Sequence, residues 1–133
     1  MLAYPFLEGL PFKIEMNRWG RIEMSPASNQ HGLVQVDIAT ELRHRPGGRV
    51  RVECSIQTTD GVRAANVAWI SDARLAQYAG ATPSPGAPEI CVEVMSPTNS
   101  WAEMHRKAGL SLQAGAEQAW TVTLHGDKTI IEA

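Results

Sequence analysis

The run Glu89–Met95, which reads Glu-Ile-Cys-Val-Glu-Val-Met, constrains the fold of this chain more than any other segment. It is rich in β-forming residues and almost continuously apolar, which is the pattern of a strand covered on both faces. The sequence therefore predicts a central strand between two packing layers. Glu93 lies inside this run. Because an unpaired buried carboxylate is costly, we expect Glu93 either to find a partner or to face a cleft.

Hydropathy patterns on either side of this strand predict the other elements. In chain order they are a hairpin over residues 12–24, an amphipathic helix over 28–44, strands over 50–56 and 67–70, a helical turn over 72–78, the central strand, a second amphipathic helix over 100–114, and a closing hairpin over 118–131. The expected order is ββαβββαββ. This predicts a mixed α/β or α+β sheet flanked by two main helices.

Length and composition favour one domain over residues 1–133, because a chain of this size can bury a core without metal or disulfide staples. No apolar run approaches the ~20 residues needed to cross a bilayer, so we expect no membrane protein. The N-terminus lacks a basic segment followed by an apolar one, which favours a cytoplasmic protein without a secretory signal. Cys54 and Cys91 are expected to be buried free thiols.

The net charge of −2 excludes a domain that coats nucleic acid by charge alone, so any DNA contact must be local. The local basic concentration consists of Arg43, Arg45, Arg49, Arg51 and Arg63. Arginines grouped in this way suit contacts with DNA phosphates. The alternative is that these charges form a solvated edge with no partner.

Several motifs, taken in order, resemble the Uma-type restriction endonuclease family of the PD-(D/E)XK nuclease superfamily. They are Ile14-Glu-Met16, Gly20–Pro26, the His-Gly pair at 31–32, Asp60-Gly61, Ala65–Ser71 and, most strongly, Ala87–Pro97 followed by Lys107, Gly115 and Gln118–Val122. The resemblance extends from about Leu10 to Val122. It implies a restriction-endonuclease-like core and Mg²⁺-dependent cleavage of DNA.

The resemblance also implies a set of site residues. In such nucleases an Asp and a Glu hold Mg²⁺, which activates a water, and a Lys helps to stabilise the transition state. Glu93 matches the family Glu, and Asn66 stands where the family has its Asp ligand. Met95 occupies the position of the family Lys, which makes Lys107 of the following helix the candidate. Glu15 is the further acid expected beside the site.

The pair Ala65-Asn66 departs from the Pro-Asp of the family. An amide keeps an oxygen ligand but removes one negative charge, and Mg²⁺ affinity depends on the number of carboxylates. The resemblance therefore implies weak Mg²⁺ binding and impaired cleavage. The alternative is a non-catalytic binding or interaction module that keeps the nuclease fold, including as a homodimer through apolar residues near Trp101 or the closing hairpin.

Each candidate residue also has a purely structural alternative. Lys107 follows Glu103 by four residues, which is the spacing of an ion pair on an exposed helix face. Glu15 could lie on the exposed side of its hairpin. Asn66 could simply favour a turn.

Overall fold

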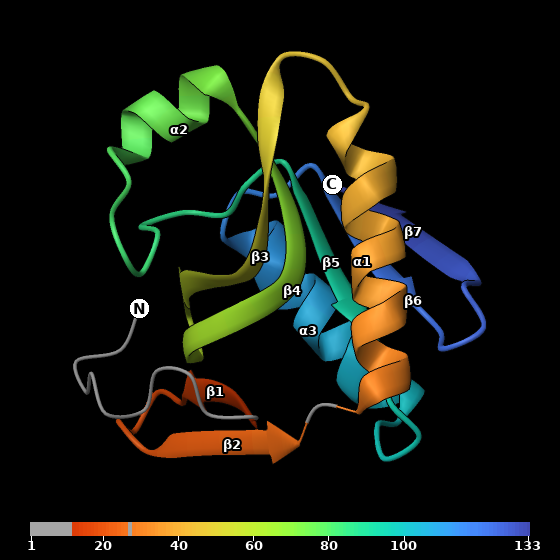
Figure 1. Ribbon diagram of the computed structural model, residues 1–133. Helices are drawn as coiled ribbons and strands as arrows, with labels where there is room; N and C mark the ends of the chain where they lie inside the picture. The colour runs from red at the N-terminus through yellow and green to blue at the C-terminus, as the bar shows by residue number, and fades with distance from the viewer. Residues whose placement is uncertain (1–11, 27) are drawn as a thin grey trace.

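The computed structural model describes residues 12–26 and 28–133, in which seven strands form one mixed sheet. In chain order the elements are β1 (Phe12–Met16), β2 (Ile22–Pro26), α1 (Asn29–Arg43), β3 (Gly48–Thr58), β4 (Gly61–Ser71), α2 (Asp72–Tyr78), β5 (Ile90–Val94), α3 (Trp101–Gln113), β6 (Gln118–Val122) and β7 (Lys128–Glu132). Figure 1 shows α1 in front of the sheet and α3 behind it. The predicted mixed fold with two main helices is confirmed.

The strands run in the order β2-β1-β4-β5-β6-β7, and β3 pairs with β4 outside this path. β5 is central, antiparallel to β4 and parallel to β6, and α3 makes the crossover that a parallel pair requires. β4 begins six residues before the predicted strand at Val67. Most of its early residues are weak strand formers, but β3 pairs with β4 from Gly61 to Ser71 at every position except Asn66.

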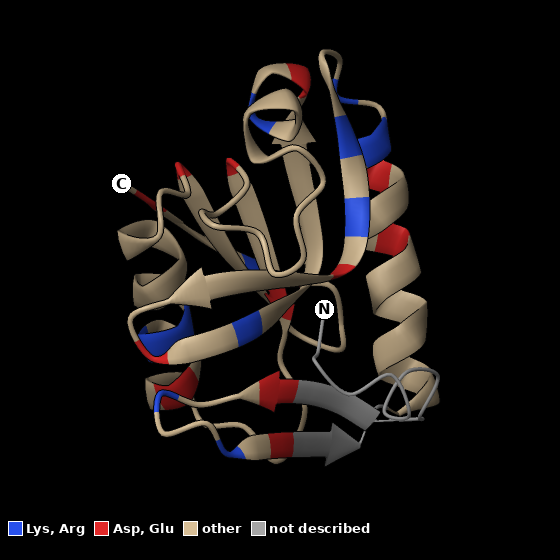
Figure 2. Ribbon diagram, turned by 90° about the vertical axis from the view of Figure 1, so that its left-hand side faces the viewer, with Lys and Arg blue, Asp and Glu red and all other residues tan. Residues whose placement is uncertain are grey.

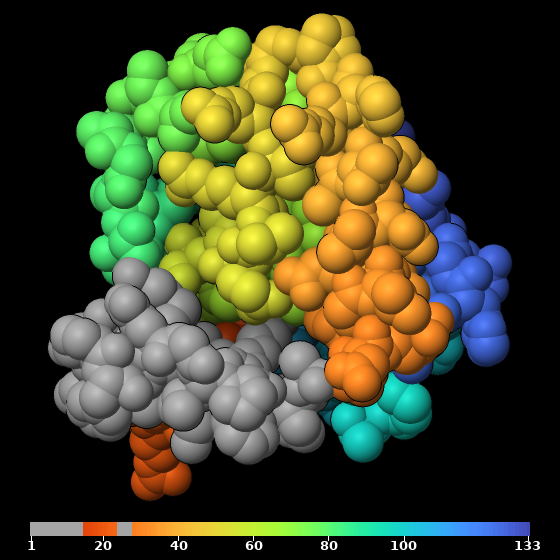
Figure 3. Space-filling view, in the orientation of Figure 1, coloured from red at the N-terminus to blue at the C-terminus, as the bar shows by residue number. Residues whose placement is uncertain are grey.

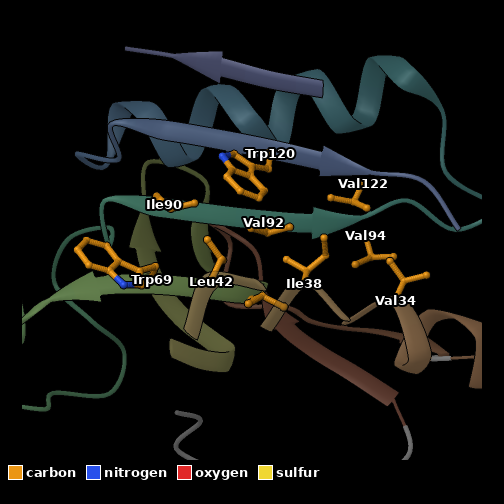
Figure 4. Packing of buried hydrophobic residues seen from close by; sticks show 10 residues of the cluster. Val34, Ile38, Leu42, Trp69, Ile90, Val92, Val94, Trp120 and Val122 are labelled. Atoms are coloured by element: carbon orange, nitrogen blue, oxygen red, sulfur yellow. The ribbon is translucent and has the colours of Figure 1, made fainter. Parts of the chain in front are cut away.

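A core lies between α1 and the sheet (Figure 4). Its residues are Val34, Ile38 and Leu42 of α1, Val67 and Trp69 of β4, Ile90, Val92 and Val94 of β5, and Trp120 and Val122 of β6. The four-residue spacing in α1 predicted this face. Each fully buried side chain of this size contributes about 1.5–3 kcal/mol to stability. Ser28 caps α1, because its side-chain oxygen accepts a hydrogen bond from the backbone N–H of His31.

A second core lies on the α3 side of the sheet. It contains Cys54, Ile56, Ala65, Ala68, Ala87, Cys91 and Ala116, with Leu112 and Ala114 packed against them. Both cysteines are buried free thiols, as predicted. Burial raises the pKa of Cys54 and Cys91, so both remain neutral at physiological pH.

β3 and β4 change faces where they pass each other at Glu53 and Asn66. Val50 and Trp69 form a pair on the α1 side, whereas Cys54 and Ala65 form a pair in the core on the α3 side. A strictly alternating strand would keep residues two apart on one face. Glu53 permits the change, because its backbone has a φ of 48°, in the left-handed region.

The helices are short relative to a bilayer. Within the described residues, no helix is both long enough and apolar enough to span a membrane.

Candidate functional site

The candidate site lies on β4, between the part of this strand that pairs with β1 and the part that pairs with β5. β1 meets β4 at the pair Met16↔Val62, and β5 begins to pair with β4 at Val67. Between these two parts, the β4 backbone forms hydrogen bonds with side chains. The Glu15 carboxylate accepts a hydrogen bond from the Ala64 N–H at 2.9 Å. The same stretch carries Asn66, the residue at the family's Asp position.

Asn66 is 1% exposed, and its amide bridges two strands. Its Oδ1 accepts a hydrogen bond from the Val94 N–H of β5 at 2.8 Å. Its Nδ2 donates to Glu53 Oε1 of β3 at 3.3 Å. A backbone N–H can only donate, so the bond to Val94 requires the amide oxygen on that side and turns the NH₂ group toward Glu53.

Gln35 of α1 joins the same group of side chains. Its Nε2 donates to Glu53 Oε1 at 2.9 Å and to the backbone carbonyl of Asn66 at 2.8 Å. Two donors therefore converge on one carboxylate oxygen. We call Gln35, Glu53 and Asn66 the amide network, which links α1, β3, β4 and, through Val94, β5.

Glu93 lies beside this network on β5 and is partly exposed in the central strand. It alternates with Val92 and Val94, which face α1, so it belongs to the α3 side of the sheet. The Asn66 amide reaches the residue directly after it. The structure thus places Asn66 and Glu93 on paired strands, at the positions that follow the pair Val67↔Val92.

Lys107 is half-buried on α3 and forms no hydrogen bond or ion pair with another described residue. The expected ion pair with Glu103 is not formed within this part of the chain. Instead the Glu103 carboxylate accepts from Asn99 Nδ2 at 3.2 Å. The Lys107 ammonium group is therefore not paired with Glu103, and Lys107 remains a candidate for the role of the family Lys. No described contact joins it to Asn66.

Glu15 is 6% exposed, so the alternative that it lies on an exposed side of the hairpin is wrong. Besides its bond to Ala64, its Oε1 lies 3.8 Å from Arg63 Nη1. The hairpin thus directs a carboxylate into the strand edge two residues from Asn66. Glu15 already accepts a backbone hydrogen bond there.

Asp60, in the turn between β3 and β4, is the centre of a charged cluster. Its two carboxylate oxygens accept from Arg18, Arg63 and Arg106, each at 2.7 Å. Hydrogen bonds from Arg106, then Arg18 and Arg63, hold the pKa of Asp60 well below its usual range. Arg63 also donates to Glu23 at 2.8 Å, and this bond lowers the pKa of Glu23. The cluster ties the β1–β2 hairpin and α3 to the turn.

The five predicted phosphate-binding arginines fall into two groups. Figure 2 shows basic segments along β3 and at the adjoining end of α1, where Arg43, Arg45, Arg49 and Arg51 lie. Arg45 also stacks over the Trp69 ring at 4.8 Å. Arg63 lies toward the other end of the β3–β4 pair, where carboxylates already surround it. The structure therefore groups four of the five.

A Mg²⁺ ion prefers oxygen ligands and the negative charge of carboxylates, and the groups around Asn66 offer little of either. The Asn66 oxygen is bonded to Val94, and its NH₂ group faces Glu53. In residues 12–26 and 28–133, no group of three or more His, Cys, Asp or Glu side chains is arranged to hold a metal ion. As the side chains stand, the residues around Asn66 do not fit a Mg²⁺ site.

Sequence reasoning missed Gln35 and Glu53. Both sit on elements that it predicted, but Gln35 reads as one polar residue on a helix and Glu53 as one charge on a wet strand face. No local pattern signals a left-handed backbone at a glutamate. A cavity of about 280 Å³ adjoins Glu53, between residues 51–55 of β3 and residues 80–82. Figure 3 shows this part of β3 at the surface between α1 and the loop after α2.

The fold defines a class of protein. The crystal structure of a "putative nuclease belonging to DUF820" from Anabaena variabilis superposes with a TM-score of 0.69 over 90% of this chain and 76% of that one, at 14% sequence identity. This likeness shows that the two proteins share one α/β fold.

The sequence identifies the family. Residues 2–129 match the Uma2 family, described as "Putative restriction endonuclease", and the chain belongs to this family. The resemblance inferred from its motifs is thereby confirmed. No curated protein matches the chain.

Proposed function

We propose that this chain is a nuclease-fold domain related to Mg²⁺-dependent DNA endonucleases, with cleavage impaired at position 66. The observation that carries the proposal is the Asn66 side chain, which is committed to Val94 and Glu53. Phosphodiester cleavage in such enzymes depends on a metal-activated water. A buried amide engaged on both sides supplies neither the charge nor a free ligand for that ion.

The remaining candidate residues keep the roles that the family implies. Glu93, on the strand beside Asn66, would supply the surviving carboxylate of the site. Lys107 would approach from α3 with a cation that Glu103 does not engage. Glu15 would act through the edge of β4, where its carboxylate holds the Ala64 N–H. In the present chain Lys107 would supply the positive charge that faces a phosphate, but the negative charge needed to bind the metal is incomplete.

DNA would approach the four grouped arginines, Arg43, Arg45, Arg49 and Arg51. They lie along β3 and the adjoining end of α1, and β3 also carries Glu53. Arginine contacts with phosphates position a duplex without reading its sequence. Arg63 is omitted from this surface because Asp60 and Glu23 already engage its guanidinium group.

The test is a nicking assay on supercoiled plasmid with Mg²⁺ and Mn²⁺. We expect little or no nicking by the natural chain and metal-dependent nicking by Asn66→Asp, because the substitution restores a carboxylate. Asn66→Asp combined with Glu93→Ala should lose that gain. If Asn66→Asp neither nicks DNA nor binds Mn²⁺ more tightly, the placement of the metal site is wrong.

The second candidate function is a non-catalytic association module. Trp101 at the start of α3 and Ile130 on the edge strand β7 are each 46% exposed. Large exposed apolar side chains and an unpaired strand edge each favour contact with another chain. Sedimentation over a range of concentrations tests this candidate: a dimer weakened by Trp101→Glu would support it, and a monomer throughout would contradict it.

A further inference from the structure

The amide network joins groups that would repel each other if position 66 carried the family's aspartate. Asn66 Nδ2 lies 3.3 Å from Glu53 Oε1. An aspartate in the same place would set a carboxylate oxygen of a buried side chain against one of the exposed Glu53. Like charges at such a distance repel each other unless the side chains move apart, one is protonated or a cation lies between them.

Glu53 is held in this position against its backbone preference. Its φ of 48° places a non-glycine residue in the left-handed region, which is unfavourable for a residue with a side chain. Such a conformation persists only where surrounding contacts determine it. Here those contacts are the bonds from Gln35 Nε2 and Asn66 Nδ2 to a single oxygen, Glu53 Oε1.

The position is also accessible from solvent. Asn66 itself is 1% exposed, but Glu53 is exposed and adjoins the cavity between β3 and residues 80–82. A hydrated ion can therefore reach the Glu53 carboxylate without opening either core.

We propose that the Asn66 amide takes the place of a divalent cation in holding Glu53 against β4, and that Glu53 is a further carboxylate, in addition to Glu93, of the cation site that an aspartate at position 66 would complete. The natural chain is then independent of divalent cations for its stability. This inference deepens the proposed function and rests on it for the assignment of position 66, but it concerns binding and stability, not cleavage.

The experiment measures the thermal midpoint of the full chain in EDTA, in Mg²⁺ and in Mn²⁺, with NaCl at matched ionic strength as the screening control. For the natural chain we expect no difference among the conditions. For Asn66→Asp we expect a midpoint roughly 5–10 °C lower in EDTA, which corresponds to one lost hydrogen bond plus repulsion. Mn²⁺ should recover at least half of that loss, because a ligand that binds the folded state stabilises it.

Two double variants assign the effect to Glu53. Adding Glu53→Gln to Asn66→Asp restores an amide–carboxylate pair with the roles exchanged, so it should fold without metal and lose the response to Mn²⁺. Adding Asp37→Asn instead removes an exposed carboxylate of α1, and the response should remain. If Asn66→Asp cannot fold in EDTA, folding on addition of Mn²⁺ is the corresponding readout.

The outcomes separate this inference from the proposed function. A midpoint of Asn66→Asp that does not respond to Mn²⁺, or responds equally with Glu53→Gln, overturns the inference even if the variant nicks DNA. A Glu53-dependent response without nicking supports the inference and contradicts the proposed ancestry of cleavage at this site.

Discussion

Asp60 shows how much one side chain can organise at the residue scale. It is 5% exposed and receives three guanidinium groups from separate parts of the chain. Arg18 and Arg106 are more than half exposed, so solvent screens their contribution. Arg63 is 12% exposed and would lose a buried partner. The bond between Asp60 and Arg63 therefore contributes more to the stability of the protein than the other two bonds of the cluster.

We predict that Asp60→Asn lowers the free energy of unfolding by about 2 kcal/mol, the range for hydrogen bonds to charged groups. Urea denaturation at neutral pH measures this value. Asp37→Asn, which changes an exposed acid, serves as the control and should stay within about 0.5 kcal/mol of the natural chain. Equal effects of the two substitutions would contradict the role given to Asp60.

The same residue predicts a pH dependence. Its arginine partners lower the pKa of Asp60 in the folded state below its ordinary value of 3.8. The stabilisation is therefore fully present above that value and is lost as the pH falls below it. In urea titrations carried from neutral to acid pH, Asp60→Asn should lose less stability than the natural chain. If the free energy of unfolding of both proteins falls equally as the pH is lowered, other carboxylates account for the loss.

Some site residues could be predicted and others could not, for physical reasons. Glu93 is a charge in an apolar strand, and Asn66 departs from a family motif, so both are visible in the sequence. Glu53 acquires its importance from a left-handed φ and from a partner thirteen residues away. Gln35 reaches the network only because α1 packs across β3 and β4. Neither condition leaves a local sequence pattern.

At the scale of elements, apolar spacing and caps determine the helices well. α3 begins after Ser100, whose side-chain oxygen accepts a hydrogen bond from the Glu103 N–H. β4 was predicted too short because Ala64, Ala65 and Asn66, directly before Val67, have weak strand preference. Pairing with β3 decides their conformation, and strand propensity depends on such context.

We predict that Ser100→Ala destabilises the protein by about 1 kcal/mol, because the first turn of α3 loses its acceptor. Ser100→Gly should cost only a few tenths of a kcal/mol, and Ser100→Asp should retain most of the stability. Chemical denaturation of the three variants measures the series. A Ser100→Asp variant as unstable as the alanine variant would mean that the side-chain bond is not the cause.

At the scale of the whole molecule, charge is arranged locally although the net charge is −2. The arginines of β3 and the end of α1 form a basic strip, while Asp60 and its neighbouring carboxylates neutralise the arginines at the opposite end of the β3–β4 pair. The composition predicted a local contact surface. The composition did not show that these arginines form two groups, because this depends on which of them the fold places beside carboxylates.

We predict that Arg49→Ala combined with Arg51→Ala weakens binding to a labelled DNA duplex, measured by fluorescence anisotropy. The slope of log affinity against log salt should fall by roughly one for each phosphate contact removed. Arg21→Ala, in the turn between β1 and β2, is the matched control on an exposed arginine and should leave both values unchanged. An equal loss in this control would indicate nonspecific attraction.

The change of faces at Glu53 and Asn66 has a consequence for how the strands find their partners. A strand that alternates without interruption can slide by two residues and still present the same faces. β3 cannot, because sliding would move its left-handed residue away from Asn66 and turn Cys54 and Ile56 out of their core. The change of faces therefore fixes the register of β3 against β4. A newly made chain that pairs these strands in another register buries neither of the two cores.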